Sequence, residues 1–487
     1  MRKAFTSQRR LDCGAVAEAE LNLDCRSEII PILRALQHVY SQPPLRDAIL
    51  DLVGQDVNQK SQRDRGRAGM DYWQIVVLAA VRLGCNLDYD ALQDLAEQHR
   101  ALRQIMGLGD WQGETFDWRR IRENVCKLRP QTIDRINRLL VTAGHQLVPD
   151  AAETVRADSF VAETDVHYPT EASLIRDGLR KILHIGAQLA ALLGVLGWRQ
   201  HKHLYRNAKQ LCRQIDRIAA RKGQGYQERL KAPYRELLEL ANSLLARATE
   251  LRTSAAEAKS ADAEPLALDK ELAVFMQRTE QVCGTARRRV LQGEQVPHSE
   301  KLFSIFEPHT QLYKRGKAGK PLQFGRLALI YEDGAGFVCH YYLPPRDAHD
   351  RDVLVEQTRL LQDRLKGRMR TISFDRGFHS PENQAALARI VEQPCLPMPG
   401  KKGQLQAENG TVEFRESRQR HPGIESAIGA LQSGNGLARS RDRSERGFER
   451  YLGLAVLGRN LHVFGKLLIA RESPACKAAY SQRGNAA

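Results

Sequence analysis

The sequence predicts a mixed α/β protein in which an all-helical N-terminal region precedes a sheet-containing body, and a helical segment interrupts that body. Three observations predict this class. Apolar residues recur every three or four positions through the first 150 residues, which is typical of amphipathic helices. At 154–161 the pattern changes to period two with β-branched residues, which indicates a strand. Helical periodicity returns at 174–289 before strand patterns resume.

Helical patterns account for the N-terminal region. The first apolar period begins at Ile29 and ends before Pro43. A second helical block covers 70–108, and two helices divided by Pro130 fit 116–146.

The body alternates between strands and helices. A helical hairpin or small bundle is expected at 174–289, interrupted near 223–225 and 254–264. Strands are expected at 154–161, 302–306, 322–331, 337–343, 370–375, 393–398 and 410–414, and helices at 350–365, 381–391 and from Pro422 and Glu445.

The composition favours a folded, nucleic-acid-binding protein. Its 487 residues suggest roughly three domains at about 150 residues each. Lys and Arg number 74 against 58 Asp and Glu, a net charge of +16, which points to a polyanionic partner, nucleic acid first and an anionic membrane surface second. A hydrophobic fraction of 42% is too high for a generally disordered chain.

The cysteines and the chain's apolar runs favour a cytoplasmic protein. Nine scattered cysteines without a CxxC pair indicate a reducing compartment and argue against structural zinc. The basic N-terminus lacks the apolar run of a signal peptide, and no stretch reaches the ~20 apolar residues that span a bilayer.

Three acids stand out against this predicted fold. Asp375 follows the end of a short predicted strand, 371–374, and ligands bind at the carboxyl edge of open α/β sheets. Asp158 lies in an otherwise apolar or small-residue strand, where an unpaired acid costs stability. Glu425 follows Pro422, which is well placed to open a helix, and it borders the apolar stripe of that helix on the side expected to face the sheet edge.

Carboxylate oxygens suit Mg²⁺ or Mn²⁺. Two such ions about 3.5–4 Å apart can activate a nucleophile and stabilise a leaving oxygen in phosphodiester chemistry. Each acid also has a simpler interpretation, as a salt-bridge partner of one of the 74 basic residues or as a charge at a helix N-terminus. Spacing alone does not separate these interpretations.

Three segments resemble, in order, the acid-bearing motifs of DDE transposases of bacterial insertion sequences, nearest to the ISNCY-type group. They are VRADSFVAETDVHYPT (155–170), ISFDRGF (372–378) and GIESAIG (423–429). Two further regions are similar to the helical N-terminal region of such transposases and to the helix after their glutamate, namely 63–108 and 437–466.

The resemblance implies a ribonuclease-H-like catalytic core, in which the first two acids lie on adjacent strands and the glutamate on a helix packed beside them. Asp158, Asp375 and Glu425 are then the catalytic and metal-binding acids, holding two Mg²⁺ or Mn²⁺ ions. The implied domains are a helical domain for DNA-end binding and dimerisation (1–150), the catalytic core (151–472), a basic helical insertion within it (174–299) and a disordered tail (473–487).

The implied activity is metal-dependent hydrolysis of a phosphodiester at the ends of a mobile element. The freed 3′-hydroxyl then attacks target DNA. The implied partners are double-stranded DNA of the ends and of the target, and a homodimer or larger assembly on DNA. We expect a cytoplasmic, nucleoid-associated protein without a membrane partner.

One departure from the family pattern keeps a second hypothesis open. Related transposases often carry Lys or Arg seven residues after the glutamate, and this chain has Gln432 there. The alternatives are therefore a catalytically inactive, transposase-derived DNA-binding protein, and a nuclease with the same core that joins no strands.

Other acids are alternatives for the three positions. Asp165 lies beyond the predicted strand and Asp177 within the predicted insertion, which makes both weaker first acids. Glu413 or Glu416 would replace Glu425 only if the helix began earlier, which Pro422 disfavours.

Basic residues and two histidines complete the candidate site. Cations recur every three or four residues along one face of a predicted helix, a pattern typical of a solvated face or of contact with a phosphate backbone, which we favour. His379 and His421 lie near two of the acids and are candidates to orient a carboxylate or contact DNA. The expected DNA-binding residues are Lys202, Arg206, Lys209, Arg213, Arg217, Arg418, Arg439 and Arg441.

Overall fold

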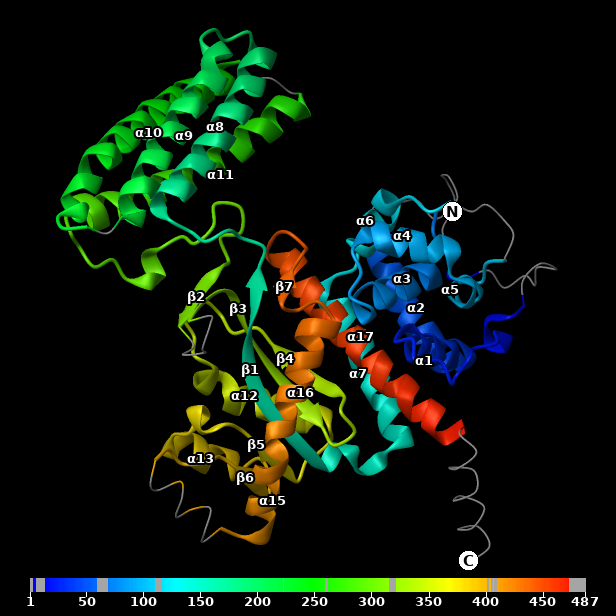
Figure 1. The fold of residues 1–487 in the computed structure, drawn as a ribbon. Coiled ribbons are helices and arrows are strands. Elements are labelled where there is room, and N and C mark those ends of the chain that lie inside the picture. Colours follow the sequence, from blue (N-terminus) through cyan, green and yellow to red (C-terminus); the bar gives the residue numbers. More distant parts are fainter. Residues whose placement is uncertain are drawn as a thin grey trace, which may run out of the picture. The chain divides into compact units, whose positions relative to one another are not determined.

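The computed structural model describes residues 3–5, 14–58, 69–109, 115–221, 223–258, 262–314, 321–400, 403, 406 and 410–472. The chain is mostly helical, at 65%, and its described strands form one mixed seven-stranded sheet (Figure 1). It divides into two compact units, the first built from the described residues of 1–164 and 326–487 and the second from those of 165–325. The tail predicted to be disordered, 473–487, lies outside the described residues.

The predicted N-terminal helices are confirmed. Pro43 does not merely end a helix, because it also occupies the first turn of the next one, where its missing N–H costs nothing. The helices are α1 (Ile29–Ser41), α2 (Pro43–Val57), α3 (Tyr72–Gly84), α4 (Tyr89–Gln98), α5 (Arg100–Ile105), α6 (Trp118–Val125) and α7 (Pro130–Leu147).

The last helix of the chain belongs to the same core as the first ones. Helix α17 (Glu445–Glu472) packs against α1, α3 and α7 (Figure 1). The approach is so close at Gly465 that an added Cβ would overlap the carbonyl oxygen of Pro31. Residues of these helices and of the sheet share one hydrophobic cluster, so residue 150 does not mark a boundary between compact units.

The sheet has strand β1 (Thr154–Thr164) near its middle. Strands β5 (Thr371–Ser373) and β6 (Gln393–Cys395) extend it in parallel on one side, and the short β7 (Arg439–Ser440) pairs in parallel with the end of β1. On the other side lies β3 (Leu322–Asp333), which pairs antiparallel with β4 (Val338–Tyr342) and with β2 (Gln311–Lys314).

Among its described residues the first unit also contains the helices α12 (Asp350–Arg364), α13 (Pro381–Leu387), α15 (Val412–Arg420) and α16 (Ile424–Gly429). The strand expected at 410–414 is wrong. The hydroxyl of Thr411 accepts a hydrogen bond from the Phe414 N–H and caps the start of α15, so a helix replaces the strand.

The second unit contains a bundle of four long helices (Figure 1): α8 (Glu171–Leu193), α9 (His201–Ala220), α10 (Tyr226–Glu257) and α11 (Ala263–Ala286). These helices occupy the segment predicted to be helical at 174–289, and the predicted interruption near 223–225 falls between α9 and α10. The second interruption is shorter than the predicted 254–264, because α10 continues through Glu257 and α11 begins at Ala263. The strand expected at 302–306 is wrong, since no strand is assigned to these described residues. Leu302 and Ile305 instead bury their side chains in the hydrophobic cluster of the bundle.

Helix α17 is long and apolar enough to span a membrane by length and composition. However, 72% of its apolar window is buried inside the fold. Such burial is typical of the core helix of a folded domain, and the contacts of α17 with α1, α3 and α7 account for it.

Candidate active site

Asp158 lies in β1, and Asp375 follows the neighbouring parallel strand β5 by two residues. The register of β1 and β5 pairs Arg156 with Ser373, and two more residues along each chain place Asp158 opposite Asp375. The backbone is still extended at Asp375, with φ −73° and ψ 158°, and the preceding N–H, that of Phe374, still donates to the carbonyl of Cys395. Because paired strands lie about 4.8 Å apart, the backbones of the two acids are neighbours at the carboxyl end of β5, although β1 itself continues to Thr164.

Each aspartate is fixed by its own local backbone. Oδ1 of Asp158 accepts a hydrogen bond from the N–H of Ser159 at 2.7 Å. Oδ1 of Asp375 accepts from the N–H of Arg376 at 2.8 Å and caps the 3-10 turn Arg376–Phe378. This turn ends β5 and leaves the Asp375 side chain exposed at the carboxyl edge, as the sequence predicts.

Glu425 lies on the helix that packs against β1. It is the second residue of α16. The apolar stripe predicted for this helix, Ile424, Ile428 and Leu431, is buried. The Glu425 side chain itself is exposed, at the border of that stripe. Neither Glu425 nor Asp375 forms an ion pair with a described residue, so the simpler salt-bridge interpretation does not account for these two acids.

The charges of both Asp375 and Glu425 affect the pKa of His421. Its Nδ1 is 3.1 Å from Oγ of Ser373, the last residue of β5. Burial lowers the pKa of His421 and the Arg156 guanidinium lowers it further, whereas the carboxylates of Asp375 and Glu425 both oppose that shift. The imidazole is therefore close enough to both carboxylates to feel their charge.

An arginine that sequence reasoning missed joins the strand of Asp158 to the segment before Glu425. Arg156 lies on the same face of β1 as Asp158, two residues earlier. Its Nε donates to Oε2 of Glu332 at 2.6 Å, and its Nη1 donates to the carbonyl of Arg420 at 3.0 Å. A Cβ added at Gly423 would overlap the same guanidinium, so a larger residue there would displace the Arg156 side chain. The alternation of β1 is the signal that places Arg156 beside Asp158.

The chemical type of the three acidic side chains suits a divalent cation. Asp158, Asp375 and Glu425 supply the hard oxygen ligands that Mg²⁺ and Mn²⁺ prefer. In the part of the chain that the structure describes, no three His, Cys, Asp or Glu side chains are gathered closely enough to form a ready-made metal cluster. The structure thus makes the backbones of two of the acids neighbours and brings the third acid to an adjoining helix.

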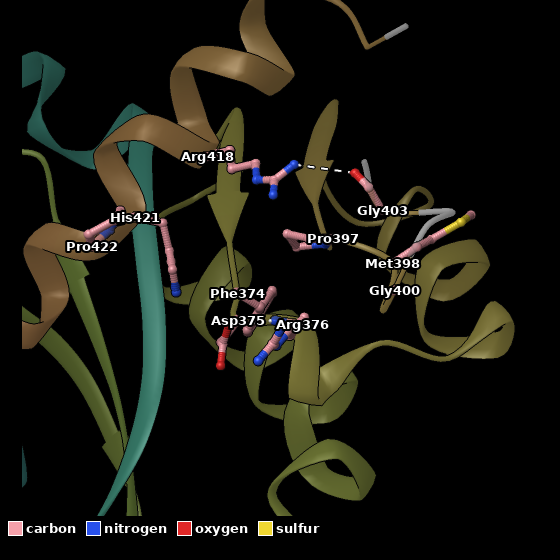
Figure 2. A pocket seen from close by; sticks show the side chains of 10 residues that line it. All are labelled: Phe374, Asp375, Arg376, Pro397, Met398, Gly400, Gly403, Arg418, His421 and Pro422. Atoms are coloured by element: carbon pink, nitrogen blue, oxygen red, sulfur yellow. Dashed lines mark hydrogen bonds between the residues drawn. The ribbon is translucent and has the colours of Figure 1, made fainter. Parts of the chain in front are cut away.

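A pocket of about 550 Å³ opens beside Asp375 (Figure 2). Asp375 and Arg376 lie on one side of it and Arg418 of α15 on another, with His421 and Met398 also contributing. The guanidinium of Arg418 donates to the carbonyl of Gly403 at 3.3 Å.

The alternative acids occupy different surroundings. Asp165 begins the second unit, and Asp177 is buried in α8, where it lies 3.5 Å from Arg176 and 3.6 Å from His167. Glu413 and Glu416 do lie on a helix, because α15 begins ahead of Pro422, contrary to the expectation from that proline. Glu416 is 3.0 Å from Arg420 in an exposed ion pair.

The predicted cationic stripe is confirmed as a feature of α9. Its five cations are exposed, and none forms an ion pair with a described residue. Arg439 lies 3.9 Å from Glu163, and Arg441 donates to Asn86 and to the hydroxyl of Tyr451. The cations of α9 are Lys202, Arg206, Lys209, Arg213 and Arg217.

Comparisons with protein-family models, with curated proteins and with solved structures found no match to this chain. Its function is therefore inferred from its residues and their arrangement.

Proposed function

We propose that this chain is a DDE-type DNA transposase of the kind carried by bacterial insertion sequences. It would hydrolyse a phosphodiester at each end of its element and join the freed 3′-hydroxyl to target DNA. The observation that carries the proposal is the strand register that places Asp158 opposite Asp375, with Glu425 on a helix packed against the same strand. Asp158 and Asp375 are 217 positions apart in the sequence and Asp375 and Glu425 are 50 apart, and each acid belongs to a motif that resembles this family.

Asp158 and Asp375 from the sheet and Glu425 from α16 would together hold two divalent cations. When bound, Mg²⁺ or Mn²⁺ supplies Lewis-acid stabilisation of charge on the phosphate and its leaving oxygen. His421 stays neutral near neutral pH because burial lowers its pKa. It therefore adds no positive charge that would weaken cation binding at the neighbouring carboxylates.

The α9 stripe would contact the phosphate backbone. Helix α9 carries five Lys and Arg against one Asp, a net charge of 5 − 1 = +4, whereas α10 carries five cations and five acids and is neutral. The charge is thus concentrated on one helix of the bundle. Such contacts supply affinity that depends on salt and carry no sequence information.

The test uses a plasmid that contains the DNA flanking the protein's own gene. Purified protein with Mg²⁺ is expected to nick or cut this DNA at the element ends and to yield joined strand-transfer products. Asp375→Ala is expected to bind the same DNA and leave it intact. Cleavage at the wild-type rate by Asp375→Ala would overturn the proposal, and cleavage without joined products would favour a nuclease.

A second candidate function is a DNA-binding protein that no longer cuts. The observations that favour it are Gln432, which stands where related proteins often have a cation, and the lack of a ready-made metal cluster among the described residues. Such a protein would bind the ends equally well in the presence of a chelator. Binding without cleavage by both the wild-type and the Asp375→Ala protein would select this function.

A further inference from the structure

The helix that carries Glu425 ends in a wide turn that contacts the N-terminal helical region. Helix α16 continues directly into the π-helical turn Ala430–Gly434, and such turns occur frequently at functional sites. Asn86, which lies between α3 and α4, donates from Nδ2 to the carbonyl of Ser433 at 2.9 Å. This hydrogen bond joins the end of the glutamate helix to a segment 347 residues earlier in the chain.

A second amide attaches the same turn to α3. Asn435 is only 5% exposed, and its Nδ2 donates to the carbonyl of Leu83 at 3.0 Å. The backbone N–H of Asn435 donates to the carbonyl of Ala430, also at 3.0 Å, and closes the turn. Because a buried amide without a partner is costly, the contact with Leu83 fixes the turn against the end of α3.

The backbone and the side chain of Asn86 are both set for the contact with Ser433. Its φ is +54°, a left-handed conformation that asparagine adopts more readily than most residues. Its Oδ1 accepts a hydrogen bond from Nη2 of Arg441 at 2.6 Å. A Cβ added at Gly436 would lie 2.7 Å from the same Oδ1, so glycine there leaves room for the amide. The bond from Arg441 thus orients the amide and leaves its Nδ2 directed at Ser433.

The other end of the glutamate helix is attached to the sheet. Nη1 of Arg156 donates to the carbonyl of Arg420 ahead of the helix, and α16 packs against β1. Glu425 lies between the two attachments, 433 − 425 = 8 residues before Ser433, or about 12 Å along a helix. A shift of the far attachment would therefore tilt the helix and move the Glu425 carboxylate relative to the two aspartates.

We propose that Asn86 is a positioning residue for the third acid of the site. It holds the π-helical turn at the end of the glutamate helix, and it thereby keeps the Glu425 carboxylate in place to bind divalent cations together with the two aspartates. The inference rests on the proposed function, because it takes Glu425 as a cation ligand. It gives the N-terminal helical region a part in the chemistry besides the expected binding of DNA ends.

Three variants of the full chain test the role of Asn86. Asn86→Gly removes the amide and keeps the backbone conformation, since glycine adopts a positive φ without strain. Ser433 and Arg441 are both exposed, so the change leaves no buried group of theirs without a partner. Asn86→Asp keeps the acceptor for Arg441 and cannot donate to Ser433. The matched control is Lys366→Gly, because Lys366 has a φ of +55° just after α12 and its exposed side chain forms no hydrogen bond or ion pair with a described residue.

Hydrogen exchange of the metal-free protein measures the turn itself. The N–H groups of Asn435, Leu437 and Ala438 donate to carbonyls of the turn. Their exchange is expected to be at least about fivefold faster in both Asn86 variants and unchanged in Lys366→Gly. Exchange at the wild-type rate in Asn86→Gly, or in Asn86→Asp alone, would overturn the assigned contact with Ser433.

Cation binding without DNA measures the consequence for the site. Titration with Mn²⁺, with the free ion counted by electron paramagnetic resonance, is expected to show affinity about tenfold weaker in Asn86→Gly, since loss of a group that supports a metal ligand costs ~10–100-fold. Lys366→Gly should bind Mn²⁺ as the wild type does. With flanking DNA, cleavage by Asn86→Gly should fall about tenfold at limiting Mg²⁺ and return to within about threefold of wild type at saturating Mg²⁺. A thermal unfolding midpoint equal to that of Lys366→Gly shows that folding is not the cause.

The outcomes separate this proposal from the proposed function. Faster exchange with unchanged Mn²⁺ affinity would overturn the positioning role and leave the transposase intact. Weaker DNA binding in chelator, with Mn²⁺ affinity unchanged, would make Asn86 a DNA contact and would overturn it too. Mn²⁺ binding that weakens in both Asn86→Gly and Glu425→Gln, in a protein that cleaves no DNA, would support the positioning role and overturn the transposase. Wild-type Mn²⁺ binding no tighter than that of Glu425→Gln would overturn both.

Discussion

The guanidinium of Arg156 donates from Nε to Oε2 of Glu332 at 2.6 Å, and the carboxylate side chain is only 2% exposed. Burial raises the pKa of Glu332, while Arg156 and Arg459 oppose that shift. The same guanidinium holds the carbonyl of Arg420, at the start of the turn that leads to Glu425. One side chain thus links a buried charge in the sheet to the candidate active site.

Arg156→Gln is expected to destabilise the protein by about 2–4 kcal/mol, because it leaves a buried carboxylate with only Arg459, 3.8 Å away, as its cationic partner. Urea unfolding measures the effect. The control is Arg370→Gln, since among the described residues Arg370 pairs only with the exposed Glu153 and Glu392, and its loss should cost under about 1 kcal/mol. Equal losses in the two variants would contradict the assigned role of Arg156.

The cost of Arg156→Gln should depend on pH. A carboxyl group with a raised pKa keeps its proton in the folded state at pH values where the unfolded chain releases it. Its stabilising contribution is therefore lost as pH rises from the ordinary value of 4.5 through the folded pKa. Without Arg156 the pKa of Glu332 rises further, so the loss of stability is expected to be larger at about pH 8 than at about pH 5. The same loss at both pH values would show that the Glu332 charge is not the cause.

Glu425→Gln is expected to reduce cleavage by more than about a hundredfold, since loss of a group that merely supports a metal ligand already costs ~10–100-fold. Glu416→Gln is the matched control on the preceding helix, where the carboxylate faces Arg420 in an exposed pair. It should leave the rate within about twofold of wild type. The reverse pattern would identify Glu416, and not Glu425, as the third catalytic acid.

Neutralising Arg213 and Arg217 should weaken DNA binding and its salt dependence. Each phosphate contact contributes about 0.9 to the slope of log affinity against log salt, so the double Gln variant should lower the slope by about 2. The double Gln variant of Arg229 and Arg235 on α10 makes the same charge change on a neutral helix. Fluorescence anisotropy over a salt series measures the slope for both double variants. An equal reduction of the slope in the two variants would show that α9 is not the specific DNA contact.

Gly465→Ala is expected to cost about 1–3 kcal/mol, because the added methyl group overlaps the backbone oxygen of Pro31, which cannot move without separating α17 from α1. Gly429→Ala offers the contrast. An added Cβ there meets nothing within 4 Å, and replacing a helical glycine by alanine gains about 0.5–1 kcal/mol. Thermal unfolding of both variants should show shifts of opposite sign.

The local sequence pattern was sufficient to predict most helices and the strand before Asp375, because the hydrophobic period and the length of an element can be read from a short stretch of sequence. It failed at 302–306, where an apolar run is buried as an irregular segment against the bundle. It also failed at Thr411, whose capping hydroxyl starts a helix in place of a strand. The two-residue strand β7 exists only through its pairing with β1.

In the candidate site, too, features with a local sequence signal could be predicted and long-range contacts could not. Asp375 and Glu425 could be selected from the sequence as candidates, since the strand end before Asp375 and the helix start before Glu425 have local signals. Asp158 lies within β1, and the apolar composition of its strand and the resemblance selected it. The contact between Arg156 and Glu332 could not, because 176 residues separate them and only the folded sheet brings them together. The pocket likewise combines residues of β5's end, the segment after β6 and α15.

The packing of α17 among the first helices has a consequence for the order of events on the ribosome. Between the end of α1 at Ser41 and the start of α17 at Glu445 lie 445 − 41 − 1 = 403 residues. At a synthesis rate of about 5–20 residues per second, roughly 20–80 s pass before α17 is made and can cover the apolar faces of α1 and α3. A nascent chain interrupted before Glu445 therefore presents these faces to chaperones and proteases, so only full-length synthesis yields a protected molecule.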